Sequence, residues 1–361
     1  RGALSAPFVY GKRGRVMPAG WAAVSFFGEE RGYVPQKNKK ALYKRGGLRY
    51  NGRKKGEDTA LIFESFDRKQ IFVREWTDVK EPVGVVQIAH GMNEYAARYD
   101  KFARALNAMG YAVVADDHRG HGDTDAETLG YAEGDMFADT VKDMAGIARF
   151  YGEKYKGLKY VLFGFSYGSF LTQAFLEKYA RFLDGAIVAG SARQSGAAVR
   201  AGRFVSGVCG ACKGEDAPAD FVNRLVFGGY DKKFGDGDWQ WLSSDRENNE
   251  KYRADPFCNF VCSNAFFRSF FRGMAGLYKK KNAAGLDRSL PLLLIAGKDD
   301  PVGGEKGMTR LYEFYRKQGI KDVSLRLIEG SRHEFLNERE HFDEAFAAIA
   351  EFIKRIPVRK R

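Results

Sequence analysis

The sequence predicts an α/β protein in which helices flank a mostly parallel sheet and a largely helical cap is inserted. Two observations predict this class. From about Thr59 onward, short apolar runs alternate with longer segments of helical periodicity, and residues 191–287 interrupt that alternation. The composition, with 44% hydrophobic residues and only 9 Pro and 4 Cys among 361, excludes disordered, collagen-like and disulfide-dense proteins.

Five runs are almost continuously apolar and rich in β-branched residues, as expected for strands that helices cover on both faces. These runs are residues 83–89, 111–115, 160–163, 186–189 and 292–296. Residues 323–328 alternate more between apolar and polar side chains, which predicts a strand nearer the edge of the sheet.

Apolar residues recur at helical spacing between and after these runs. The predicted helices are residues 99–109, 137–155, 169–179, 307–318 and 341–356. The stretch 191–287 lies between two predicted core strands, is too long for an ordinary connection and contains helical fragments of its own. We interpret it as a cap inserted into a single domain that spans residues 59–361.

Residues 1–58 form a basic N-terminal extension, with 14 lysines and arginines against 4 acidic residues. Because this segment is Gly-rich and poorly periodic, we expect a poorly ordered, solvated arm and no nucleic-acid partner. Its start resembles a signal peptide, but no clear cleavage site follows, so we expect a cytoplasmic protein. Trp21, Phe26 and Phe27 within this charged arm suggest weak peripheral contact with anionic lipid surfaces. The sequence does not indicate an oligomeric state.

The motif GFSYG at residues 164–168 follows the predicted strand 160–163 and opens the predicted helix 169–179. This is the context of a nucleophile elbow, a sharp turn that presents a nucleophilic side chain above the sheet. The two glycines occupy positions where such a turn tolerates no side chain, and the positive end of the helix lies at the serine. We therefore predict Ser166 as the nucleophile.

A serine hydroxyl needs a base, normally a histidine that a carboxylate holds in one tautomer. Among five histidines, only His333 lies in the late loop where the order nucleophile, acid, histidine places the base. We assign the three histidines that follow earlier strands to loop architecture. These are His90, His118 and His121.

The acid is expected after the predicted strand 292–296, where Asp299 and Asp300 are adjacent. Pro301 biases Asp300 toward extended geometry and a turn. The spacing alone leaves the two aspartates nearly even.

Together these landmarks resemble the monoacylglycerol lipase and lysophospholipase branch of the α/β-hydrolases, often grouped with serine aminopeptidase-like hydrolases. The resemblance covers about residues 60 to 356. The matching segments are AHGMNEYAARY (89–99), ADDHRGHGDT (115–124), GFSYGS (164–169), GKDDPVGG (297–304) and GSRHEFLNE (330–338).

The resemblance implies roles for four residues besides the serine. Asp300, which precedes the Pro-Val pair, corresponds to the triad acid, and His333 corresponds to the base. The backbone N–H groups of Met92 and Tyr167 correspond to the oxyanion hole. Asn93, Tyr95 and the side chain of Tyr167 depart from the residues common in the family, which bears on the shape of the pocket and not on the triad.

The resemblance implies a serine carboxylic-ester hydrolase that acts on small-molecule acyl esters, such as monoacylglycerols or lysophospholipids, through an acyl-enzyme. One alternative is an aminopeptidase or amidase of the same fold, which would need cap carboxylates to bind a substrate ammonium group. The available carboxylates are Glu215, Asp216, Asp220 and Asp236. A second alternative is an acyltransferase that uses the same triad and passes the acyl group to an alcohol.

The cap is rich in aromatic residues, and four of them form one broad helical face: Phe266, Phe267, Phe270 and Phe271. We expect this face to form the core of the cap. It can also form a wall of an acyl-chain tunnel, and the two roles are compatible.

Four cysteines are too few for a disulfide scaffold in a chain of this length. Their spacing fits a four-thiolate zinc site imperfectly, so we expect free thiols. They are Cys209, Cys212, Cys258 and Cys262. The sequence holds no dinucleotide, phosphate-loop or HExxH motif, and the predicted chemistry needs no cofactor or metal.

Overall fold

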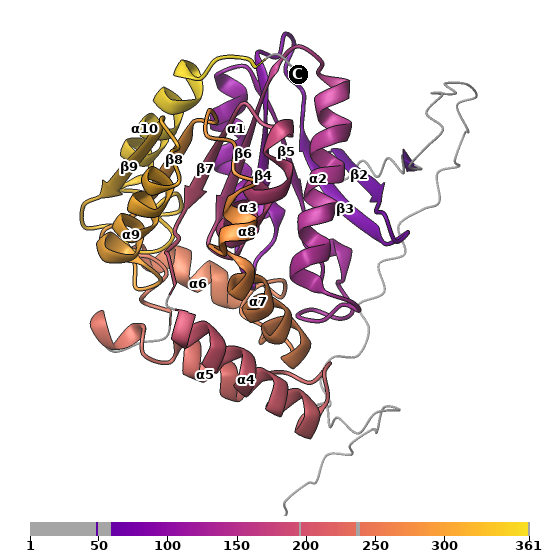
Figure 1. The fold of residues 1–361 in the computed structure, drawn as a ribbon, viewed down its shortest axis with the longest axis vertical. Coiled ribbons are helices and arrows are strands. Elements are labelled where there is room, and N and C mark those ends of the chain that lie inside the picture. Colours follow the sequence, from indigo (N-terminus) through magenta and orange to yellow (C-terminus); the bar gives the residue numbers. More distant parts are fainter. Residues whose placement is uncertain (1–47, 50–58, 195, 236–238, 360–361) are drawn as a thin grey trace, which may run out of the picture. The chain divides into compact units, whose positions relative to one another are not determined.

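The computed structural model describes residues 48–49, 59–194, 196–235 and 239–359. Its centre is a sheet in which the described strands have the order β1-β2-β3-β5-β4-β6-β7-β8-β9 (Figure 1). Apart from β1 (Leu48–Arg49), the predicted basic extension of residues 1–58 lies outside the described residues. Each strand from β4 to β9 runs parallel to its neighbours within that group, which confirms the predicted α/β class with a mostly parallel sheet.

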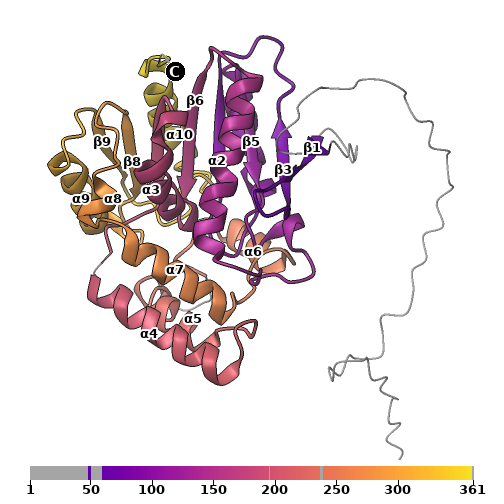
Figure 2. The same ribbon diagram turned by 45° about the vertical axis from the view of Figure 1, so that its right-hand side comes forward.

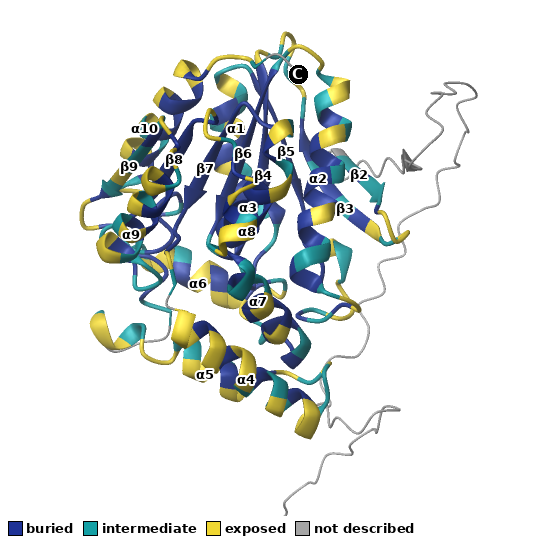
Figure 3. Cartoon of the chain, viewed as in Figure 1, coloured by how far each residue is buried: buried dark blue, intermediate teal, exposed yellow. Residues whose placement is uncertain are grey.

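All six predicted strands are present. They are β4 (Gly84–Ala89), β5 (Tyr111–Asp116), β6 (Lys159–Phe165), β7 (Gly185–Ala189), β8 (Leu292–Gly297) and β9 (Val323–Ile328). Within the strands β4, β5, β6, β7 and β8 every residue is buried, whereas β9 is partly exposed at the edge of the sheet (Figure 3). The clearer alternation of β9 in the sequence therefore reflects its edge position.

The sequence prediction did not include the hairpin formed by β2 (Thr59–Glu64) and β3 (Gln70–Trp76). Its turn contains Arg68 at φ 70°, a left-handed conformation that is uncommon for a residue with a side chain. β3 pairs antiparallel with β5, so the hairpin extends the parallel sheet beyond β5.

Helices cover both faces of the sheet (Figure 2). The helices α2 (Met136–Lys154), α3 (Tyr167–Tyr179) and α9 (Gly304–Lys317) pack on one face, and α1 (Asp100–Ala108) and α10 (Phe342–Arg355) pack on the other. Successive strand residues alternate between these two cores, as Val85 and Val86 of β4 do. Four short 3₁₀ helices complete the described connections: η1 (Ala96–Tyr99), η2 (Gly122–Thr124), η3 (Ala180–Phe182) and η4 (Asp231–Lys233).

Between β7 and β8, within the stretch predicted as a cap at 191–287, the chain forms further helices. They are α4 (Gly196–Lys213), α5 (Asp220–Phe227), α6 (Arg246–Ala254), α7 (Asn264–Gly276) and α8 (Lys280–Ala283). In Figures 1 and 2, α4, α5 and α7 lie across one end of the sheet. The helices α4 and α7 pack closely, since a Cβ at Gly202 would lie 2.5 Å from the ring of Phe271. No helix among the described segments is long and apolar enough to cross a bilayer.

Candidate active site

The serine of the GFSYG motif lies in a tight turn between β6 and α3. Ser166 has φ 52° and ψ −117°, a backbone conformation that residues with a side chain rarely adopt. A Cβ at Gly164 would lie 2.1 Å from Thr172 Oγ1. A Cβ at Gly168 would lie 2.1 Å from the carbonyl oxygen of Ala89. Close packing therefore requires both glycines of the motif, and the turn places Ser166 at the N-terminus of α3, where the helix dipole favours negative charge.

Three side chains that are distant in the sequence form one hydrogen-bonded line. Ser166 Oγ lies 2.9 Å from His333 Nε2. His333 Nδ1 lies 2.9 Å from Asp300 Oδ2, and the other carboxylate oxygen of Asp300 accepts a 2.8 Å hydrogen bond from the Val302 N–H. Since a carboxylate only accepts, Asp300 holds the imidazole proton on Nδ1 and leaves Nε2 to accept the hydroxyl proton.

The neighbouring aspartate has a different environment. The Asp299 side chain is 46% exposed and lies 2.9 Å from Lys233 Nζ, whereas Asp300 is 3% exposed. The two aspartates, which the spacing in the sequence did not separate, are therefore distinguished by burial and by the contact with His333.

The imidazole of His333 is buried between two aromatic rings. Its ring centroid lies 4.7 Å from that of Phe165 and 5.1 Å from that of Trp241. Burial lowers the pKa of His333, but the charge of Asp300 and the hydrogen bond to it raise the pKa more, so the net shift is upward from 6.5. The carboxylate thus strengthens His333 as a proton acceptor.

The loop after β4 and the start of α3 bring two backbone amides to the site. The N–H of Gly91 donates to Glu94 Oε1 at 2.5 Å, and that of Asn93 donates to His121 Nε2 at 3.2 Å. Met92 lies between these two residues. Within the described residues, neither the N–H of Met92 nor that of Tyr167 donates a hydrogen bond. Both residues line the cavity beside Ser166.

Behind the loop after β4, three buried histidines pack together, outside the cavity lining. The rings of His90 and His118 stack with centroids 4.0 Å apart, and those of His90 and His121 lie 5.3 Å apart. Burial lowers the pKa of all three, and that of His118 to about 3. Because His121 Nε2 accepts from the Asn93 N–H, this histidine supports the loop that holds Met92.

Asn93 joins the same loop to the cap. Its φ is 60°, a region that asparagine tolerates better than most residues. The side-chain Nδ2 donates to the carbonyl oxygen of Phe260 at 2.6 Å, and Oδ1 accepts from the Cys262 thiol at 3.0 Å. Asn93, one of the residues that depart from the family pattern, therefore connects the cap with the loop beside Ser166.

A buried charge cluster, which the sequence analysis did not identify, joins two loops of the site. Arg98 Nη1 lies 2.7 Å from both Glu94 Oε2 and Glu334 Oε1. Burial raises the pKa of Glu94. Burial also acts to raise the pKa of Glu334, but Arg98 outweighs it and the net shift is downward. Glu94 and Arg98 stand four residues apart, a spacing that signals a pair, whereas nothing local in the sequence signals Glu334.

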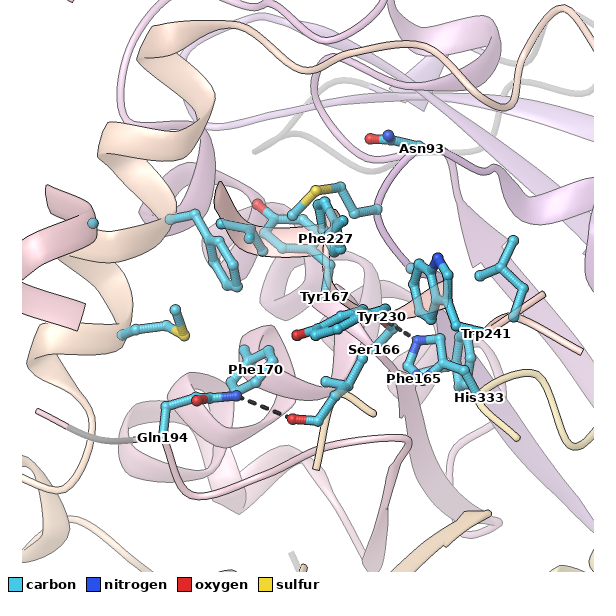
Figure 4. A pocket seen from close by; sticks show the side chains of 18 of the residues that line it. Asn93, Phe165, Ser166, Tyr167, Phe170, Gln194, Phe227, Tyr230, Trp241 and His333 are labelled. Atoms are coloured by element: carbon cyan, nitrogen blue, oxygen red, sulfur yellow. Dashed lines mark hydrogen bonds between the residues drawn. The ribbon is translucent and has the colours of Figure 1, made fainter. Parts of the chain in front are cut away.

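A cavity of about 430 Å³ opens beside the Ser166 hydroxyl. Its lining comes from the loops at the carboxyl ends of the parallel strands and from the cap, and most of it is apolar. Figure 4 shows Phe170, Phe227, Tyr230 and Trp241 around the hydrogen-bonded Ser166 and His333.

The four aromatic residues predicted as a possible tunnel wall divide into two pairs. Phe270 and Phe271 line the cavity, whereas Phe266 and Phe267 do not. Phe266 packs on Tyr167 with ring centroids 5.0 Å apart, and Phe267 stacks on Phe271 at 6.2 Å. Phe266 and Phe267 are thus used in core packing. Our proposal for the substrate site therefore retains only Phe270 and Phe271 of the four.

All four cysteines are free thiols, and Cys258 and Cys262 are buried. Burial raises the pKa of both thiols. No cluster of histidine, cysteine or acidic side chains in the described part of the chain is arranged to hold a metal ion.

This fold and site define an α/β-hydrolase, a hydrolytic enzyme in which a strand-to-helix turn presents the nucleophile. Residues 80–340 match the family described as "Serine aminopeptidase, S33", and the chain belongs to this family.

The comparisons place the chain near the monoacylglycerol lipases. It is 28% identical over 271 residues to a monoacylglycerol lipase of Mycolicibacterium smegmatis, covering 73% of this chain and 86% of that protein. It is 23% identical over 270 residues to the monoglyceride lipase of Homo sapiens, covering 74% and 80%. A thermostable carboxyl esterase from Bacillus coagulans, solved in complex with glycerol, is 26% identical with a TM-score of 0.75, covering 84% of this chain and all of the esterase.

Proposed function

We propose that the protein is a serine hydrolase that cleaves carboxylic acyl esters, such as monoacylglycerols or lysophospholipids, through an acyl-enzyme. The observation that carries the proposal is the line Asp300, His333, Ser166 beside an apolar cavity. The names of the similar lipases and of the carboxyl esterase support an ester as substrate. The cytoplasmic location, the lack of a nucleic-acid partner and the lipid contact of residues 1–58 stay predictions.

In the first half of the proposed reaction, Ser166 Oγ attacks the ester carbonyl carbon while His333 Nε2 accepts the hydroxyl proton. The tetrahedral intermediate then expels the alcohol, which receives the proton from His333. In the second half, His333 deprotonates a water molecule that attacks the acyl-enzyme. The carboxylic acid leaves and the proton returns to Ser166.

The N–H groups of Met92 and Tyr167 donate hydrogen bonds to the oxyanion of the intermediate in this mechanism. Both amides lack a partner among the described residues and both residues line the cavity. Donors of this kind contribute about 3 kcal/mol each to lowering the barrier. Because the donors are backbone groups, the tyrosine side chain after the nucleophile is compatible with this role.

The carboxylates around the cavity favour an ester over an aminopeptidase substrate. The only acidic side chains lining the cavity within the described residues are Glu94 and Glu334, and both are paired with Arg98. Of the candidate cap carboxylates, Glu215 pairs with Arg268. Asp216 and Asp220 do not line the cavity, and Asp236 lies outside the described residues. A substrate ammonium group would therefore find no unpaired carboxylate among the lining residues described.

The test is hydrolysis of p-nitrophenyl esters from acetate to palmitate by the wild type and by Ser166→Ala. We expect the substitution to lower kcat by about 10⁶, the effect of removing the serine of such a triad. A fluorophosphonate probe should label the wild type at Ser166, as mapped by peptide mass. Hydrolysis that survives the substitution would mean that another group is the nucleophile.

An acyltransferase with the same triad is the second candidate, because the acyl-enzyme can also react with an alcohol. Product analysis with and without an added acceptor alcohol separates the two activities. Dominant acyl transfer at low alcohol concentration would reject the assignment as a hydrolase.

A further inference from the structure

A second pocket, of about 400 Å³, lies in the cap. It is formed by the loop after β7, the first half of α4 and the segment that joins α7 to α8. Gln194, Val199 and Met274 line this pocket and also the cavity beside Ser166, so the two share a wall. The proposed ester hydrolysis makes no use of this second pocket.

The lining of the second pocket is strongly cationic. It contains Arg193, Arg200, Arg203 and Lys279 and no carboxylate. Within the described segments, no ion pair involves any of these four side chains. Other arginines of the cap are paired: Arg268 lies 2.9 Å from Glu215, and Arg272 lies 3.3 Å from Asp135. All four side chains are exposed, and together they make the electrostatic potential at the pocket positive.

Two of the arginines have identifiable neighbours at the pocket. The guanidinium of Arg193 lies 5.4 Å from the ring centroid of Tyr278 and 5.1 Å from that of Phe314. Cation–π contacts with these two rings favour this position at the pocket wall. Arg200 lies over the first turn of α4, because a Cβ at Gly196 would be 3.5 Å from Arg200 Nη1.

The position of Arg200 beside the start of α4 is electrostatically unfavourable by itself. α4 begins at Gly196, which lines the pocket, and the positive end of a helix repels a cation. An anion bound between the helix end and the guanidinium would turn both repulsions into attractions. The chemistry of the pocket therefore fits an anion with several oxygen atoms, which guanidinium groups bind by paired hydrogen bonds.

We propose that this pocket binds a phosphate group. The second pocket lies next to the cavity beside Ser166, because the two share three lining residues. The phosphate is therefore either part of an acyl ester bound beside Ser166 or free phosphate. The first source rests on the proposed ester hydrolysis, whereas the second does not.

The first experiment compares two esters that differ only in the phosphate, 1-octanoylglycerol and 1-octanoylglycerol 3-phosphate, below the concentrations at which they aggregate. The full-length protein is compared with the double variant Arg200→Ala/Arg203→Ala. If the phosphate belongs to the ester, the ratio of kcat/KM for the phosphorylated ester to that for the neutral ester falls on the order of tenfold or more in the variant.

A charge-matched control removes two cations from α4 and α5 that line neither cavity, in Lys213→Ala/Arg224→Ala. This variant should keep the wild-type ratio. An equal fall in both double variants would show general surface attraction in place of a phosphate site, and would overturn the proposal.

The second experiment titrates inorganic phosphate into Ser166→Ala protein by calorimetry, with and without the two pocket substitutions. Binding that the pocket substitutions abolish, with an unchanged ester ratio, would identify free phosphate as the ligand. No binding together with an unchanged ratio would overturn the proposal. If the wild type hydrolyses neither ester, the proposed function fails, and the phosphate titration still decides on the site.

Discussion

A buried imidazole is ordinarily a weak base, because burial disfavours its protonated form. His333 is 2% exposed and yet has a pKa above 6.5, since the Asp300 carboxylate more than offsets the effect of burial. The same carboxylate fixes the tautomer that presents Nε2 to Ser166. One residue thus sets both the direction and the strength of proton acceptance.

The pKa of His333 predicts an acid limb in the activity. Protonated His333 cannot accept the proton of Ser166, so kcat/KM should fall about tenfold per pH unit below an apparent pKa that lies above 6.5. In Asp300→Asn we expect a kcat lower by about 10⁴ and an acid limb at lower pH, because the substitution removes the largest effects that raise the pKa of His333 while burial still lowers it. Rate profiles and the ¹⁵N shift of His333 measure both effects. An imidazole pKa equal in the two proteins would contradict the role of Asp300.

Among the residues of the candidate site, the sequence could predict Ser166 and His333, because a local motif and the order along the chain carry that information. It could not separate Asp299 from Asp300 without the family resemblance. The difference between these two lies in burial and in contacts across the fold, to Lys233 in one case and to His333 in the other.

Two loops at the carboxyl end of the sheet depend on one buried cation. Arg98, in η1, binds Glu94 in the loop after β4 and Glu334 in the loop after β9. Glu94 in turn accepts from the Gly91 N–H, one residue before Met92, and Glu334 follows His333 directly. The cluster therefore ties the loop of a proposed oxyanion donor to the loop of the proposed base.

Removing the cation should destabilise the fold, because Arg98→Met leaves two buried carboxylates without a counter-charge. We expect the free energy of unfolding at pH 8 to fall by about 3–5 kcal/mol, as measured by urea denaturation. The unpaired carboxylates then have raised pKa values, so the folded variant binds more protons than the unfolded one. Its deficit relative to the wild type should therefore shrink as the pH falls from 8 to 6.

The matched control is Arg355→Met, which removes an exposed partner of Asp322. Exposed pairs of this kind contribute about 0–1 kcal/mol. Similar losses in the two variants, or a deficit for Arg98→Met that does not change with pH, would argue against a buried charge cluster.

Strands and helices could be predicted where neighbouring residues in the sequence carry the pattern that forms them. The strands β4 to β8 are continuous apolar runs because helices cover both of their faces, and such runs are visible in the sequence. The antiparallel hairpin of β2 and β3 was not predicted, since each strand is partly exposed and mixes polar with apolar residues. The contacts of Glu334 were also beyond prediction, because they join loops 236 residues apart.

Over the whole molecule, the cap and the sheet together enclose the apolar cavity. The sequence indicates an inserted segment at 191–287, but it does not show which aromatic residues face the cavity, because that depends on how α4 and α7 pack. Phe270 and Phe271 face it, and Phe266 and Phe267 do not. Aromatic side chains suit both environments equally, so composition carries no information on the choice.

Cavity shape should set the preference for acyl chains. Ala198 of α4 is exposed and lines the cavity, so Ala198→Trp narrows it without disturbing the core. We expect kcat/KM for p-nitrophenyl palmitate, relative to that for the acetate, to fall on the order of tenfold. Ala197→Trp, at an exposed neighbouring position outside the lining, should keep the wild-type ratio. Equal ratios in the two variants would place the acyl chain elsewhere.

The hydrogen bonds of Asn93 have a mechanical consequence. Its side chain is bonded to Phe260 and Cys262 of the cap, and its N–H to His121 behind the loop. Any outward movement of the 260–262 segment must either break these bonds or pull on the backbone amide of Met92, the residue before Asn93. The position of this cap segment and the position of the proposed oxyanion donor are thus mechanically coupled.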